Sequence, residues 1–232
     1  MMLTDAGSVP SRQLTFCFHG IGSPGRPLEP GEERFWLSLG QFHDILSVVV
    51  AHSRSVQLTF DDANESDVTI ALPALTKCGL RAEFYLIADR LDTRGSLSKD
   101  HVRALSGAGM SVGTHGMTHR SWRELRGRSE FDAELGDSSR LIESLTDTPV
   151  TRAACPGGQY DRRVLRALKS RGFTRVYSVD GGTSVPSAWL QSRYTVIRDD
   201  TLVTIKSYLD QADPTFPARL VERARESVKR WR

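Results

Sequence analysis

Along the chain, short apolar runs that end in polar residues alternate with longer segments whose apolar residues recur near the 3.6-residue period of a helix. One apolar run, residues 56–60, passes directly into Asp61 and Asp62. Strands that alternate with helices are typical of parallel βα units, and a single α/β barrel reaches the 232 residues of this chain. The pattern therefore predicts one α/β domain whose polar chemistry lies where the strands end.

The same periodicities locate the individual elements. Strands are predicted at residues 14–18, 56–60, 81–87, 111–114, 150–155, 176–179 and 194–197. Helices are predicted at residues 33–46, 68–78, 98–107, 129–145, 164–172, 201–211 and 216–231. Ser98 and Asp161 are suited to cap the helices that follow them. Residues 48–51 fit a short strand or the end of the preceding helix, and residues 180–193 are predicted to form a loop.

The two aspartates are the first candidates for chemistry. Successive residues of a strand point to opposite sides, so Asp61 and Asp62 can take different tasks, one on a metal ion and one facing a substrate. Taken alone, the pair is more typical of a turn, because aspartate is a common turn residue.

Two histidines follow another apolar segment. His115 and His119 are four residues apart, and on a helical turn this spacing places two imidazoles on one face, as the binding of one metal ion requires. The alternative is a pair of exposed histidines at the start of a helix. Two histidines and one aspartate leave metal positions open for water and substrate, which is typical of a hydrolytic site.

Three segments together resemble a known family: residues 59–62 (Thr-Phe-Asp-Asp), residues 115–119 (His-Gly-Met-Thr-His) and residues 154–161 (Ala-Cys-Pro-Gly-Gly-Gln-Tyr-Asp). They are similar to the polysaccharide deacetylases with a NodB homology domain, carbohydrate esterase family 4. The resemblance runs from about residue 14 to about residue 210. It implies a distorted (β/α) barrel of the NodB type, with an N-terminal extension at residues 1–13 and one catalytic domain at residues 14–232.

The resemblance also implies roles for the residues that match. Asp62, His115 and His119 would hold a divalent metal ion, zinc in the manner of the family, and Asp61 would be the general base. The implied reaction removes an N-acetyl group from an acetylated sugar or glycan. A backbone N–H in the segment around residues 158–160 would stabilise the oxyanion, and the residues implied to bind the substrate are Pro156, Gly158 and Tyr160.

The sequence departs from the family at two positions. No histidine follows His119, although many members carry a late histidine as general acid. His19, at the end of the first strand, is the candidate replacement, Asp199 is a weaker one, and a structural role is the alternative for both. Arg152 precedes Pro156 by four positions rather than two, so the arginine that tethers the base is not assigned, and Arg193 is a further candidate.

Composition narrows the class of protein. The net charge of +3 comes from scattered arginines without an aromatic-basic pattern, so a nucleic-acid partner is not predicted. Cys17, Cys78 and Cys155 leave an odd cysteine and predict no disulfide framework, and Cys17 and Cys155 are expected in the core. Neither a secretory signal nor an apolar run of membrane-spanning length is visible, which predicts a cytoplasmic protein.

Two other functions remain open at this stage. One is hydrolysis of a non-sugar amide or cyclic imide on the same fold, and the other is a non-catalytic carbohydrate-binding relative, for which the missing late histidine is the motive. No pattern in the sequence determines the oligomeric state.

Overall fold

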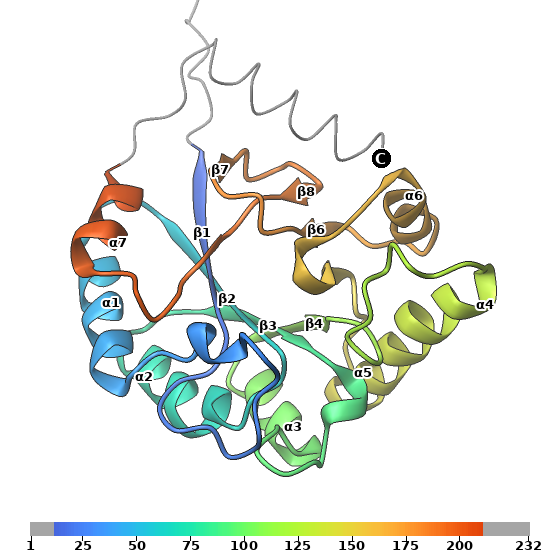
Figure 1. Ribbon diagram of the computed structural model, residues 1–232, viewed down its shortest axis with the longest axis horizontal. Helices are drawn as coiled ribbons and strands as arrows, with labels where there is room; N and C mark the ends of the chain where they lie inside the picture. The colour runs from blue at the N-terminus through green and yellow to red at the C-terminus, as the bar shows by residue number, and fades with distance from the viewer. Residues whose placement is uncertain (1–11, 211–232) are drawn as a thin grey trace, which may run out of the picture.

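The computed structural model describes residues 12–210. Its strands form one sheet in the order β7-β1-β2-β3-β4-β5-β6-β8, with β9 also paired to β1 (Figure 1). Neighbouring strands are parallel except for β7, which runs antiparallel to β1. The strands are β1 (Gln13–Phe18), β2 (Val56–Asp61), β3 (Ala82–Leu86), β4 (Ser111–Thr114), β5 (Arg152–Ala154), β6 (Arg175–Tyr177), β7 (Thr183–Ser184), β8 (Leu190–Gln191) and β9 (Tyr194–Thr195).

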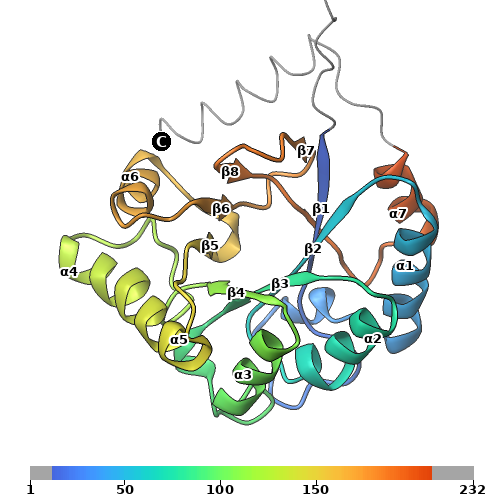
Figure 2. The same cartoon turned by 180° about the vertical axis from the view of Figure 1, so that it is seen from behind.

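The two ends of this order approach each other. The backbone N–H of Ser192, just after β8, donates to the hydroxyl of Ser184 in β7 at 2.8 Å. The sheet therefore wraps into a nearly closed barrel with helices around it (Figure 2). The predicted single-domain, distorted (β/α) barrel is confirmed.

The helices lie outside the sheet. They are α1 (Leu39–Ala51), α2 (Leu72–Lys77), α3 (Lys99–Gly107), α4 (Arg128–Phe131), α5 (Ser138–Thr146), α6 (Arg162–Ser170) and α7 (Leu202–Leu209). Shorter helical turns are η1 (Glu32–Phe35), η2 (Asp67–Ala71), η3 (Ala88–Arg90), η4 (Asp132–Asp137) and η5 (Pro156–Gly158), of which η2 and η4 are π-helical. Ser98 and Asp161 cap α3 and α6 as predicted, because their side chains accept backbone N–H groups of the first turn.

A row of aromatic rings on neighbouring strands shows which side faces the helices. Phe18 is in register with Phe60, and Phe60 with Phe84, and their rings stack with centroids 5.2 and 4.8 Å apart. Phe42 of α1 meets Phe18 edge-on at 5.6 Å, so this row points outward to the helix layer. Because side chains alternate along a strand, Asp61 points to the opposite side, into the barrel.

The interior of the barrel is different in character. Cys17 and Thr59 are in register there, and Tyr85 is in register with Asp61. Tyr85 and Tyr177 form a buried cluster of their own, separate from the large apolar core between sheet and helices. The interior thus provides polar and aromatic contacts for a buried carboxylate.

Three predictions of local structure are wrong or incomplete. The helix predicted at residues 33–46 is interrupted, because Ser38 accepts the N–H of Gln41 and starts α1 anew after η1. Residues 48–51 belong to the end of α1. The predicted loop at residues 180–193 contains β7 and β8, which are too short to leave a periodic signal. The helix predicted at residues 216–231 and nearly all of the predicted extension at residues 1–13 lie outside the described residues.

None of the helices found within residues 12–210 combines the length and the apolar character that crossing a bilayer requires.

Candidate active site

The carboxyl ends of β1, β2, β4 and β5 bring the predicted site residues to one cavity. Its volume is about 580 Å³. The lining includes His19 after β1, Asp61 and Asp62 at the end of β2, His115 and His119 after β4, and Gly157 and Gly158 after β5. The site therefore forms where parallel strands of an α/β fold usually bind ligands.

Asp62, His115 and His119 form the group suited to a metal ion. Asp62 Oδ1 lies 3.6 Å from His115 Nε2 and 3.5 Å from His119 Nε2. This oxygen is buried and has no hydrogen-bond partner among residues 12–210. Since an unpartnered buried carboxylate oxygen is costly, its position between two imidazole nitrogens fits a bound cation.

The orientation and the pKa of His115 also suit the binding of a metal ion. Its Nδ1 lies 2.8 Å from the carbonyl oxygen of Ala154, which fixes the ring and leaves Nε2 directed at Asp62. Burial lowers the pKa of His115 to about 4. The imidazole is therefore neutral at pH 7, which is the form that binds a metal.

Arg193 binds the other aspartate. Its Nη1 and Nη2 donate to Oδ1 and Oδ2 of Asp61 at 2.8 and 2.7 Å, and both side chains are buried. Burial alone would raise the pKa of Asp61, but Arg193 and His115 lower the pKa below its usual range. Asp61 therefore remains a carboxylate. The tether predicted as one possibility for Arg193 is present, whereas Arg152 pairs with Glu83.

Comparison with known proteins decides the family. A sequence profile described as polysaccharide deacetylase matches residues 49–176, more than half of the chain. The chain belongs to the polysaccharide deacetylase family.

Individual relatives of this family member are distant in sequence. YxkH of Bacillus subtilis, which is assigned by name to the polysaccharide deacetylases, is 23% identical over 131 residues. This match covers 56% of the present chain and 47% of YxkH, so the chain spans about half the length of that relative.

Solved structures resemble the fold. A polysaccharide deacetylase from Bacillus cereus aligns with a TM-score of 0.76 at 19% identity, covering 87% of this chain and 70% of that one. The Streptococcus pyogenes deacetylase PplD, solved in complex with acetate, aligns with a TM-score of 0.75 at 16% identity, covering 88% of this chain and 100% of that one.

The histidine pair of this deacetylase-family chain is not on a helix. The prediction of a helical turn is wrong: His115 and His119 lie in an irregular loop, in which Gly116 has φ 91° and His119 has φ 66°. A Cβ on Gly116 would lie 2.7 Å from Glu134 Oε2, so the loop passes too close to this carboxylate for any other residue. The two imidazoles converge through this loop and not through helical periodicity.

Glu134 holds that loop and was missed in the sequence. It is 4% exposed, and its Oε2 accepts the backbone N–H groups of Met117 and Thr118 at 2.9 and 3.3 Å. Its Oε1 accepts the hydroxyl of Thr118. Glu134 lies in the π-helical turn η4, between the buried Phe131 and Ser138. The sequence carried one signal for this residue: a glutamate at a position of the predicted helix where the helical period calls for a buried residue.

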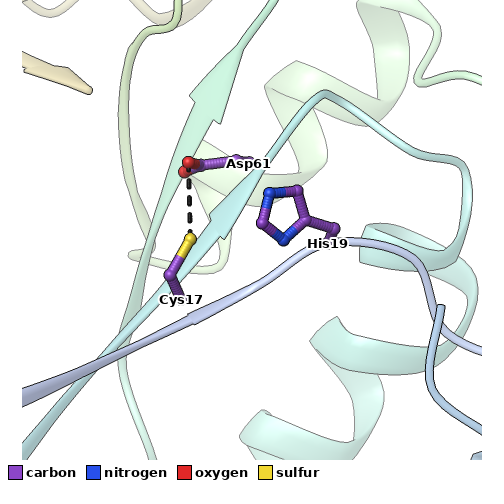
Figure 3. A group of neighbouring side chains, drawn as sticks. All are labelled: Cys17, His19 and Asp61. Carbon is purple, nitrogen blue, oxygen red and sulfur yellow. Dashed lines mark hydrogen bonds between the residues drawn. The ribbon is translucent and has the colours of Figure 1, made fainter. Parts of the chain in front are cut away.

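Cys17, in β1, and His19, just after β1, both lie beside Asp61 (Figure 3). Cys17 is fully buried, as predicted, and its thiol donates to Asp61 Oδ2 at 3.4 Å. Burial raises the pKa of Cys17 well above its usual value, so the sulfur keeps the proton that it donates. A ring nitrogen of His19 and a carboxylate oxygen of Asp61 lie within 4.8 Å. The His19 ring stacks on Phe35 with centroids 4.9 Å apart.

The segment after β5 is placed differently from what the resemblance implies. Gly158 lines the cavity, but Tyr160 is only 2% exposed and its hydroxyl donates to Asp180 at 2.8 Å. Pro156 is likewise buried. The N–H groups of Gly158 and Gln159 donate to the carbonyl oxygens of residues 155 and 156, so neither points freely into the cavity.

The weaker acid candidate lies elsewhere. Asp199 is exposed, and the cavity is lined by Asp200 in its place.

Proposed function

We propose that this protein hydrolyses the N-acetyl amide of an acetylated sugar or glycan with the help of one divalent metal ion, for which zinc suits the donor set. The observation that carries the proposal is that two adjacent aspartates have different partners. Asp62 faces two imidazole nitrogens, while Asp61 beside it is held by Arg193 and kept ionised. The volume of the cavity, about 580 Å³, is ordinary for a small-molecule or sugar site.

Asp61 is the general base of the proposed reaction. A divalent cation held by Asp62, His115 and His119 would lower the pKa of a water molecule and polarise the acetyl carbonyl. Asp61 is next to this ligand set, with Oδ2 3.7 Å from His115 Nε2, and takes the proton from the attacking water. Arg193 and Cys17 both donate hydrogen bonds to the carboxylate of Asp61, and these contacts keep it in one orientation.

His19 is the general acid of the proposed reaction. An amine leaves an amide poorly unless it is protonated, so a proton donor must line the same cavity. His19 lines the cavity, its ring is held against Phe35, and its Nδ1 is buried without a hydrogen-bond partner among the described residues. Within residues 12–210, the other histidines of the cavity are the two metal-ligand candidates.

The oxyanion of the tetrahedral intermediate needs a backbone donor. The N–H groups of Gly158 and Gln159 are used within their own turn, so we assign this role to Gly157, which precedes them and lines the cavity.

The test is acetate release from N-acetylglucosamine oligomers, combined with elemental mass spectrometry of the purified protein. We expect about one zinc-like ion per chain, and its loss together with acetate release in the double variant His115→Ala, His119→Ala. Asp61→Asn should keep the metal and lose activity by about a thousandfold or more. Metal retained without both histidines would contradict the ligand set. Full activity of Asp61→Asn would remove the base from the mechanism.

A further inference from the structure

A second cavity, of about 470 Å³, lies between α4 and α6. The two helices are neighbours on one flank of the barrel in both views (Figures 1 and 2). Four arginines line this cavity, Arg126, Arg128, Arg163 and Arg171, and Asp132 is the one carboxylate among its described lining residues. We call these four residues the arginine pocket. Its lining carries a clear surplus of positive charge.

Two members of the arginine pocket are held in place by the fold. Arg171 pairs with Asp132 at 2.5 Å and donates to the carbonyl oxygen of Ala167 at 3.1 Å. Arg163 donates to the carbonyl oxygen of Arg123 at 2.7 Å. Guanidinium groups that are already positioned lose little conformational entropy when they bind an anion.

The other two members are exposed, and their charge is at most partly compensated. The nearest acid to Arg128 is Asp132 at 3.6 Å, which already pairs with Arg171, and the side chain of Arg128 is 92% exposed. Arg126 is exposed, and its backbone N–H donates to Glu130 at 2.7 Å. Asp132 is shared by two guanidinium groups, and Asp161 lies 3.7 Å from Arg163. Two carboxylates against four guanidinium groups leave a positive charge, so the pocket attracts anions.

A short loop connects the arginine pocket to the candidate active site. His119 lines the first cavity and Arg126 lines the second. Seven residues of chain span at most about 25 Å, so one extended glycan can reach both cavities. The loop also contacts the wall of the first cavity, because Ser121 donates to the side chain of Gln159, next to Gly158.

We propose that the arginine pocket binds the carboxylate or phosphate groups of an acidic glycan whose N-acetyl group occupies the first cavity. This inference rests on the proposed deacetylase function and names its substrate class. Guanidinium groups bind carboxylates and phosphates through paired hydrogen bonds. The one aromatic residue of the lining, Phe131, is 5% exposed and offers no platform for stacked bases, which favours a glycan over single-stranded nucleic acid.

The first experiment measures binding without turnover. A fluorescently labelled oligogalacturonate hexasaccharide is titrated with the full chain, and anisotropy is recorded at low and at high salt. We expect the double variant Arg126→Glu, Arg128→Glu to bind at least about tenfold more weakly. The matched control, Lys77→Glu, Arg103→Glu, reverses the same number of charges on α2 and α3 and should bind as the wild type does. Equal affinity of the pocket variant and the wild type would overturn the proposal.

Competing ligands test the choice of a glycan. A labelled oligothymidylate and vesicles of phosphatidylglycerol present phosphate groups on a nucleic acid and on a lipid surface. Tighter binding of either probe than of the acidic hexasaccharide, lost in the pocket variant, would overturn the glycan assignment. A neutral N-acetylglucosamine hexamer should bind the pocket variant and the wild type equally, because it carries no charge for the arginines.

Acetate release separates this inference from the function on which it rests. If the wild type binds the acidic hexasaccharide through the arginines but deacetylates no sugar, the proposed function fails and the anion site stands. If the wild type deacetylates neutral oligomers and the pocket variant loses no affinity for the acidic probe, the function stands and the acidic substrate class fails.

Discussion

Arg193 donates hydrogen bonds to both carboxylate oxygens of Asp61, which lies 132 residues earlier in the chain. The guanidinium lies beside two neighbouring tyrosine rings of the barrel interior, 5.7 Å from the centroid of Tyr85 and 5.5 Å from that of Tyr177. Its Nε donates to the carbonyl oxygen of Ser178 at 3.2 Å. The contact therefore joins the end of β2 to the last strands of the barrel, and several predictions depend on it.

Replacement of Arg193 should destabilise the fold, because it leaves the carboxylate of Asp61 buried without a partner. We expect Arg193→Met to lower the free energy of unfolding by about 3–5 kcal/mol, the usual cost of removing one partner of a buried ion pair. The double variant Asp61→Asn, Arg193→Met should recover part of this loss, since no unpaired carboxylate remains. Denaturant unfolding of the metal-free protein measures both. Equal stability of the single and double variants would contradict a direct pairing energy.

The same pair predicts a dependence on pH. The pKa of Asp61 is below its unfolded value of about 3.9, so the stability from this pair is present above that pH and is lost as the pH falls through the folded pKa. In Arg193→Met, burial without the cation should instead raise the pKa of Asp61. The difference in unfolding free energy between wild type and variant should therefore be largest near neutral pH and shrink towards about pH 3. A difference that grows on acidification would contradict this assignment.

His19→Gln separates the proton donor from a structural histidine. We expect kcat for acetate release to fall by about a hundredfold or more, because the leaving amine loses its acid, while metal content stays unchanged. His43→Gln, at an exposed position of α1, is the matched control and should leave kcat unaltered. A variant at His19 with normal kcat but a lower melting temperature would assign this residue to structure alone.

Glu134→Gln should weaken metal binding without touching a ligand. The charged carboxylate accepts two backbone N–H groups and one hydroxyl of the histidine loop, so its replacement loosens the loop that carries His119. Changes in such supporting contacts typically cost about 10–100-fold in metal affinity. Competition with a chelator measures the affinity, and Glu124→Gln, at an exposed position, is the control. Unchanged affinity in Glu134→Gln would show that the loop holds its shape without this carboxylate.

Gly158→Ala tests the wall of the cavity. Gly158 has φ 66°, and an added Cβ would lie 2.2 Å from Val179 Cγ2. Gly172 has φ 80° with no atom within 4 Å of an added Cβ, so Gly172→Ala reports the backbone cost alone, about 1 kcal/mol. We expect Gly158→Ala to be clearly less stable than Gly172→Ala and to lose acetate release as the wall shifts. Equal stabilities would mean that Val179 moves aside freely.

Local patterns were sufficient for much of the fold. The alternation of apolar runs with helical periods predicted the parallel strands β1 to β6, and the caps at Ser98 and Asp161 were predicted correctly. The two short motifs with Asp61, Asp62, His115 and His119 also predicted that these side chains meet. Parallel strands bring their carboxyl ends to one edge of the sheet. A motif that directly follows such a strand in the sequence therefore lies at that edge.

Contacts between distant segments were decided only by the folded chain. The sequence offered Arg193 only as one of two candidate tethers of Asp61, because the choice depends on how the last strands close the barrel. Glu134 reaches the histidine loop through a π-helical turn, and the loop itself replaces the helical turn that the spacing of the histidines predicted. Periodicity describes which side of an element is buried, whereas tertiary packing determines which buried polar groups become partners.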